Sequence, residues 1–417
     1  MKYTEYKNSG IPWFPIIPAN WDCCKIKSHF RLRSTKVSDQ EYPALSVSKQ
    51  GITPQLDTAV KTDNGDNRKL VLKGDFVVNS RSDRKGSCGV SPYDGSVSLI
   101  NIVLEPQNVH APYYHYLFRS NDYVEEFYRN GRGIVADLWT TRWNEMSSIM
   151  IPLPPVEEQK KMALYLDKEL ALIESCKCQR ERELQTLNEL KQAEIASVVT
   201  HGLNPNVPMK DSGFPWIGMI PEHWNVKSLR AYLHLVSEKN HPNATLLSVT
   251  REQGVIVRDV DSKEENHNFI PEDLSGYKFV RKGQFVINKM KAWQGSYGVS
   301  PFDGIVSPAY YVCDLDFPNK EYFSLAIRSK TYVDFFARWS KGIRVGQWDL
   351  EPIALKSVPF LEPPVKEMQE IVDYVKRKTQ KIDTMIEALT AEIDRLTEYK
   401  QRLISDVVTG QINIQDE

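Results

Sequence analysis

The stretch Gly89–Gly95 has the sequence GVSPYDG, and Gly298–Gly304 repeats it as GVSPFDG. Further matches continue on both sides at a constant offset of 209 residues (298 minus 89), from Lys73 to Thr200. Near the start of the chain, SGIPW at 9–13 returns as SGFPW at 212–216. Such a period is far too long for a solenoid of short repeats, so the chain contains a duplicated domain.

Length and composition limit the classes of protein. A chain of 417 residues with 41% hydrophobic content can form several cores, and the repeat predicts two globular domains plus helical segments. The net charge of −1 excludes a wholly basic nucleic-acid binder, although a local basic face remains possible. No apolar run approaches the roughly 20 residues that span a bilayer, and Met1–Glu5 lacks a signal-peptide core. We expect a cytoplasmic protein without membrane contact.

Each globular copy has features of both strands and helices. Short apolar runs at Ala44–Val47, Phe76–Val78 and Val97–Leu104 predict strands, because clusters of turn-forming residues separate them. The stretch Tyr113–Tyr128, which matches Tyr322–Ala337, predicts a helix in each copy. The predicted fold class is therefore α+β, with two mixed α/β domains.

A proline-rich boundary and a long segment without proline or glycine follow each globular copy. The boundaries are Ile151–Val156 and Leu361–Val365, and proline is tolerated at a helix start. The segments end near Gly202 and Gly410, where glycine is the usual C-terminal stop. The sequence thus predicts two helices of about 44 residues, each roughly 65 Å long.

The second long segment carries an apolar stripe with steps of three and four residues, which is typical of a coiled coil. Its members are Ile371, Val375, Ile382, Met385, Leu389, Ile393, Leu396, Leu403 and Val407. The first segment has a weaker stripe, interrupted by Arg180 and Glu194. These patterns favour an antiparallel coiled coil that relates the copies by a pseudo-two-fold axis. The alternative is that each helix packs only on its own domain.

These features predict five consecutive segments: a globular domain at 1–150, a helix at 151–202, a globular domain at 203–357, a helix at 358–410 and a tail at 411–417. The chain has no G-x-G-x-x-G, Walker A or H-E-x-x-H motif, and no Asn/Asp-Pro-Pro-Tyr/Phe motif of an amino-methyltransferase. We therefore expect no catalytic residue, cofactor or metal site in this chain.

Two windows with matching flanks differ between the copies. Between Lys73 and Ser98, 15 of the 26 positions are identical in the second copy, yet the six at 80–85 share nothing with 289–294. The second window, 132–139, corresponds to 341–348 and keeps only Gly, Ile and Trp. The alternative to a functional difference is ordinary drift of exposed loops.

The residues that differ include types that recognise DNA. Arginine bonds to guanine and glutamine to adenine in the major groove, and lysine neutralises phosphates. The candidate DNA-binding residues are Arg81, Arg84, Lys85, Arg132, Lys289, Lys291, Trp293, Gln294, Lys341, Arg344 and Gln347.

The order of these features resembles the specificity subunit of type I restriction-modification systems. A tryptophan-containing start, a mixed domain, a Pro-Pro-Val-x-Glu boundary and a long helix occur in that order twice. The boundary PPVEEQ at 154–159 matches the family motif, whereas PPVKEM at 363–368 departs from it through Met368 in place of glutamine. The resemblance covers essentially the whole chain.

The resemblance implies that each globular part is a target recognition domain for one half of an asymmetric, bipartite site in double-stranded DNA. The helices would act as a spacer and as the docking surface for two modification (methyltransferase) subunits. Those subunits carry S-adenosylmethionine, and restriction (motor-nuclease) subunits use ATP and Mg²⁺. Two alternatives remain: an adaptor that joins protein partners without DNA, and an enzyme such as a fused methyltransferase-nuclease, for which no motif is present.

Overall fold

The computed structural model describes residues 2–55, 65–81, 84–133, 139–259, 271, 273–340 and 348–414. It divides into two compact units. Unit 1 comprises Met1–Glu181 and Ala391–Glu417, and unit 2 comprises Arg182–Thr390. The boundaries between these units fall inside both long helices. The units therefore do not correspond to the five predicted segments, which stay a prediction. Among the described residues, no helix combines the length and apolar character needed to cross a membrane.

Unit 1 contains a four-stranded antiparallel sheet in the order β10-β9-β12-β4, formed by Cys88–Val90, Phe76–Asn79, Asn101–Pro106 and Phe30–Arg33. A three-stranded sheet β11-β8-β5 joins Gly95–Val97, Arg68–Val71 and Lys36–Val37. The other pairs are β1–β2 (Tyr6–Asn8, Ile16–Pro18), β6–β7 (Leu45–Ser48, Gly51–Pro54) and β3–β13 (Asp22–Lys25, Met150–Leu153). The helices are η1 (Ile26–Ser28), α1 (Ala111–Leu117), α2 (Asn121–Arg129) and α3 (Trp143–Met146).

Unit 2 repeats this plan. Its four-stranded sheet has the order β17-β24-β21-β22, from Leu233–Val236, Tyr310–Leu315, Phe285–Asn288 and Tyr297–Val299. The remaining pairs are β14–β15 (Met209–Asp211, Met219–Pro221), β16–β25 (Asn225–Ser228, Pro359–Glu362), β18–β19 (Leu247–Thr250, Gly254–Val257) and β20–β23 (Lys278–Val280, Gly304–Val306). The short helices are η4 (Leu229–Ala231), η5 (Ala292–Gln294), α5 (Lys320–Ile327), α6 (Lys330–Trp339) and α7 (Pro352–Ser357).

The register of the central sheet is the same in both units. Val77 pairs with Gly89 and Val103 in unit 1, and Val286 pairs with Gly298 and Val312 in unit 2. Buried valines fill equivalent positions of this sheet because alternate residues of a strand face the same side. The predicted duplication and α+β class are confirmed.

Two predicted elements were wrong in extent. The predicted helix Tyr113–Tyr128 is two helices, because Ser120 caps α2 by accepting a hydrogen bond from the Tyr123 amide. A break at the equivalent place separates α5 from α6, where the Ser329 side chain makes no capping hydrogen bond. The apolar run Val97–Leu104 is likewise two strands, separated by a turn in which the Asn101 amide donates to the Ser98 carbonyl.

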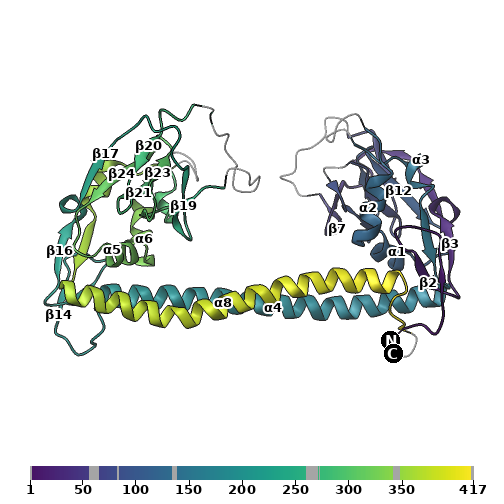
Figure 1. The fold of residues 1–417 in the computed structure, drawn as a ribbon. Helices are drawn as coiled ribbons and strands as arrows, with labels where there is room; N and C mark the ends of the chain where they lie inside the picture. The colour runs from purple at the N-terminus through teal and green to yellow at the C-terminus, as the bar shows by residue number, and fades with distance from the viewer. Residues whose placement is uncertain are drawn as a thin grey trace. The chain divides into compact units, whose positions relative to one another are not determined.

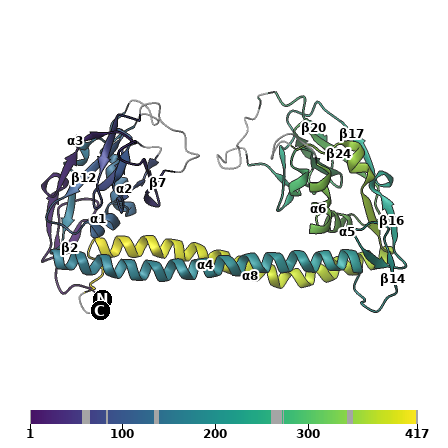
Figure 2. The same cartoon turned by 180° about the vertical axis from the view of Figure 1, so that it is seen from behind.

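The two long helices, α4 (Val156–His201) and α8 (Val365–Val408), lie side by side and antiparallel within each unit (Figures 1 and 2). In unit 1, Arg180 Nε lies 3.0 Å from Glu392 Oε1. In unit 2, the Tyr374 hydroxyl donates to Glu194 Oε1 at 2.6 Å. The two polar interruptions of the predicted stripe therefore bond to the opposite helix, and the alternative of unpaired helices is wrong.

One member of the predicted stripe does not belong to the seam. Met385 is 55% exposed, whereas Ile386 is partly buried and continues the alternating steps of four and three from Ile382 to Leu389. The misplacement arises because neighbouring Met and Ile residues offer two apolar positions 100° apart on the helix, and the sequence alone does not select one.

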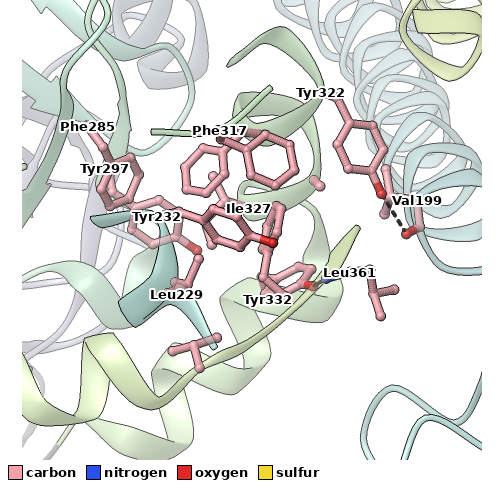
Figure 3. Packing of buried hydrophobic residues seen from close by; sticks show 14 of the residues in the cluster. Val199, Leu229, Tyr232, Phe285, Tyr297, Phe317, Tyr322, Ile327, Tyr332 and Leu361 are labelled. Atoms are coloured by element: carbon pink, nitrogen blue, oxygen red, sulfur yellow. Dashed lines mark hydrogen bonds between the residues drawn. The ribbon is translucent and has the colours of Figure 1, made fainter. Parts of the chain in front are cut away.

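The last turn of each long helix is anchored by a tyrosine in the core of a unit. In unit 2, the Tyr322 hydroxyl donates to the Val199 carbonyl at 3.4 Å, amid a cluster of aromatic side chains (Figure 3). In unit 1, the equivalent Tyr113 donates to the Val408 carbonyl at 2.8 Å. Carbonyls at a helix end lack intrahelical partners, so each buried hydroxyl satisfies one of them.

Candidate DNA interface

The two variable windows of unit 1 meet on one short backbone ladder. Arg81 and Arg132 both form antiparallel bridges with Thr140, although about 50 residues separate them in the chain. The Thr141 amide also donates to the Ser80 carbonyl at 3.0 Å. The first window leaves the sheet at the end of β9, so the sheet and this ladder fix where both windows lie.

The candidate side chains of unit 1 differ in their contacts. Arg81 and Arg84 are exposed. Lys85 Nζ lies 2.5 Å from Glu125 Oε1 and 4.7 Å from the centre of the Tyr128 ring. Arg132 is 84% exposed, with Nε 3.4 Å from Glu145 Oε1. Exposed ion pairs of this kind contribute little free energy, so a phosphate can replace the carboxylate as partner.

The windows also meet in unit 2. The Lys289 carbonyl accepts from the Leu350 amide at 3.1 Å, and Lys289 Nζ lies 2.8 Å from Asp349 Oδ2, a bond that raises the pKa of Lys289. The ring centres of Trp293 and Trp348 are 5.1 Å apart. Trp348 ends the second window, so this aromatic contact joins the two windows directly.

The structure places the other unit 2 candidates as follows. Lys291 is exposed, and Gln294 is partly buried in η5. Trp293 Nε1 is buried without a hydrogen-bond partner among the described residues. Lys341, Arg344 and Gln347 lie outside the described residues. Lys289 and Trp293 hold the windows together, which leaves Lys291 and Gln294 as the stronger candidates of this unit.

A carboxylate joins each long helix to its globular part, and it is buried at Glu158 and partly buried at Glu367. Trp21 Nε1 donates to Glu158 Oε2 at 2.7 Å, and Trp224 Nε1 donates to Glu367 Oε2 at 3.1 Å. These four residues belong to the two motifs that the copies share, the tryptophan-containing start and the Pro-Pro-Val boundary. Sequence reasoning found both motifs but did not predict that they bond to each other.

The departure at Met368 has a local explanation. In unit 1, the equivalent Gln159 is fully buried, donates to the Pro154 carbonyl and accepts from the His110 amide, both at 2.8 Å. Met368 fills this position in unit 2 with an apolar side chain. The neighbouring Gln369 accepts from the Asn319 side chain at 3.0 Å, so an amide one residue later contacts the same strand-to-helix connection.

Within the described ranges, no group of three or more His, Cys, Asp or Glu side chains is arranged to hold a metal ion. The candidate interface consists of Arg, Lys and Gln side chains, some of them partly buried, on a framework that both units share.

Residues 20–186 match the family model of the type I restriction modification DNA specificity domain. The chain is 21% identical over 364 residues to the type I restriction enzyme EcoDI specificity subunit of Escherichia coli, covering 79% of this chain and 77% of that protein. It is 25% identical over 369 residues to the StySPI specificity subunit of Salmonella potsdam, covering 82% and 75%.

A solved chain from work on complex assembly and conformational transition of the type I R-M system matches with a TM-score of 0.66. Its sequence identity is 14%, and the match covers 95% of this chain and 99% of that one, which shows a shared fold. The duplicated domain, the paired long helices and these matches lead to one conclusion: residues 20–186 match the type I restriction modification DNA specificity domain, and the chain is similar over most of its length to type I restriction-modification specificity subunits.

Proposed function

We propose that this chain selects the DNA target of a type I restriction-modification complex, with each unit recognising one half of an asymmetric, bipartite double-stranded site. The observation that carries the proposal is the meeting of the two variable windows in both units, at Thr140 in unit 1 and at the Trp293–Trp348 contact in unit 2. Loop drift alone gives no reason for two windows that change between fixed flanks to become neighbours in both units.

The chemistry of the exposed residues supports unlike half-sites. Arg81 and Arg84 offer guanidinium donors in unit 1, whereas Lys291 and Gln294 offer an ammonium and an amide in unit 2. Guanidinium groups fork onto guanine and amides onto adenine, so the two units would prefer different bases. A net charge of −1 is compatible with this, because phosphate contacts depend on local charge.

In this proposal the chain contributes recognition, and partner subunits contribute the reactions. Two modification subunits would dock on the chain and supply S-adenosylmethionine for adenine methylation, which requires the base to leave the stack. Restriction subunits would supply the ATP- and Mg²⁺-dependent motor and nuclease. The adaptor alternative explains the helices but not the Arg, Lys and Gln residues at the windows.

The test is to express the chain with its modification subunit and to map methylated adenines by single-molecule sequencing. We expect one asymmetric motif with an unread gap. Gln294→Ala should relax one position of the second half-site at a cost of about 1–3 kcal/mol. Gln380→Ala, an exposed glutamine on α8, is the matched control and should leave the motif unchanged. Relaxation of the first half-site would contradict the assignment, and a complex that ignores DNA sequence in gel shifts would favour the adaptor.

A further inference from the structure

A third loop follows the same pattern of fixed flanks and changing residues. The hairpins β6–β7 and β18–β19 have matching first strands, LSVS at 45–48 and LSVT at 247–250. Their turns differ in length and content: Lys49-Gln50 in unit 1 and Arg251-Glu252-Gln253 in unit 2. All five turn residues are exposed. The first strand and the closing glycine of the hairpin are therefore alike in the two copies, whereas the tip and the rest of the second strand differ.

The framework of the two turns is built alike. The Ser48 hydroxyl accepts from the Gln50 amide at 3.2 Å, and the Thr250 hydroxyl accepts from the Gln253 amide at 3.2 Å. A glycine closes each turn, Gly51 with φ +115° and Gly254 with φ +75°, in the region that other residues rarely adopt. The backbone path is thus set by residues outside the tip.

An arginine at equivalent positions bonds to the backbone of each turn. Arg328, which follows α5, donates from Nη2 to the carbonyls of Arg251 at 3.0 Å and Glu252 at 2.6 Å. Arg119, which follows α1, donates from Nη2 to the Lys49 carbonyl. Because the acceptors are main-chain carbonyls, this contact is independent of the side chains at the tip. Burial lowers the pKa of Arg328, because removing the charged guanidinium from water costs free energy. The hydrogen bonds to the turn carbonyls offset this cost.

The turns pack on the strand that follows the first window. A Cβ placed on Gly298 would lie 3.4 Å from the Gly254 Cα, and one on Gly89 would lie 3.3 Å from the Gly51 Cα, so each hairpin packs backbone to backbone on the next strand of the sheet. Those strands, β22 and β10, begin at Tyr297 and Cys88, directly after the shared Gly-Ser that ends the first window. Figure 1 marks the hairpins at β7 and β19.

We propose that these two turns are a third DNA-contacting loop of each unit, and that Arg119 and Arg328 are the positioning residues that hold them against the first window. The inference rests on the proposed function and adds residues to it. Lys49 and Arg251 supply cations for phosphates or guanine, and Gln50 and Gln253 supply amides for adenine. A clamp on the backbone lets the tip vary between copies while its position stays constant.

The experiment uses the full chain assembled with its modification subunits and compares methylation of sites randomised in one half at a time. Arg251→Ala and Gln253→Ala should each lower activity on, or relax, the second half-site by roughly 5- to 100-fold and leave the first unchanged. Arg328→Met should do the same, and Arg328→Lys should recover part of the loss because lysine still donates to the carbonyls. Arg119→Met should act on the first half-site only.

Lys282→Ala is the matched control, because this exposed lysine precedes β21, at the opposite end of that strand from the first window. If the wild-type complex discriminates at the second half-site and every turn and clamp variant discriminates equally well, the inference is overturned and the proposed function stands. If the wild-type complex discriminates at neither half-site, the proposed function itself fails. Should Arg328→Met not fold, the exposed tip variants decide the question alone.

Discussion

Glu158 and Glu367 begin the two long helices, and each accepts a hydrogen bond from a buried tryptophan, but their other partners differ. Glu158 also accepts from Asn20 Nδ2 at 2.7 Å and from the Tyr3 hydroxyl at 3.2 Å. Glu367 instead bonds to His223 Nε2 at 2.8 Å. The bond between carboxylate and indole is the same wherever a long helix meets its globular part. The other donors around the carboxylate differ with the loop that supplies them.

The turn before the central strand shows the same principle with a different outcome. In unit 1, buried Asp75 accepts from Arg33 Nε at 2.7 Å and from the Leu72 amide at 2.9 Å. In unit 2, Gln284 accepts from the Arg281 amide at 2.7 Å and donates to Asp314 at 2.7 Å. The capped backbone amide is preserved, whereas an ion pair in one unit becomes a neutral amide-to-carboxylate bond in the other.

We expect the largest effect on stability at Glu158 and Glu367, where the long helices meet the globular parts. Glu158→Gln should lower the free energy of unfolding by about 3–4 kcal/mol, because the new amide group faces donors and leaves at least one unpaired. Glu367→Gln should cost about 1–2 kcal/mol, because its carboxylate is more exposed and has fewer donors. Chemical denaturation of the two variants measures the difference. Equal losses would show that the indole contact alone stabilises both joints.

The ion pair of unit 1 should be next in size. Asp75→Ala leaves Arg33 and the Leu72 amide without their acceptor, so we expect a loss of about 2–3 kcal/mol. Gln284→Ala removes neutral bonds only and should cost about 1 kcal/mol. Thermal unfolding of both variants beside the parent chain tests the order. A larger loss for Gln284→Ala would show that the neutral amide stabilises its unit more than the ion pair stabilises unit 1.

Much of this framework could be predicted from the sequence, and the exceptions have physical reasons. Both long helices were predictable because proline, glycine and a periodic apolar stripe are local signals. The break at Ser120 was missed because a serine cap inside an apolar pattern has no strong local signature. The meeting of Arg81, Arg132 and Thr140 was also not predictable, since a bridge between distant segments depends on tertiary structure.

The third loop was missed for a simpler reason. Before Lys73 the copies do not share the constant offset, and the turn is one residue longer in the second copy, so matching by offset does not align Lys49 with Arg251. A signal existed nonetheless: LSV recurs at 45–47 and 247–249, and Arg-Ser recurs at 119–120 and 328–329. The individual DNA contacts remain predictions, and three of them lie outside the described residues.

The smallest effect is a pH dependence confined to unit 1. Burial, and then the nearby Arg119, lower the pKa of His115 to about 4, whereas Ser324 occupies the equivalent position in unit 2. Between about pH 6.5 and pH 4 the unfolded chain binds a proton that the folded chain does not, so stability falls as the pH falls through this range.

The His115→Ser variant should remove that slope. Unfolding midpoints of the parent chain and the variant, measured from pH 7.5 to pH 4.5, should diverge only below about pH 6.5. Parallel curves across the whole range would show that folding does not lower the pKa of His115.

The discontinuity of unit 1 has a consequence for how the chain is made. Leu403, Ile404, Val407 and Val408 belong to the same core as Trp21 and Tyr113, whereas unit 2 is one uninterrupted segment. During translation, residues 1–181 are made first, but part of their core stays uncovered until residues 391–414 have been made. All residues of unit 2 are made before that segment. The N-terminal half therefore exposes apolar core surface for longer during synthesis, and exposed surface of this kind is prone to aggregation.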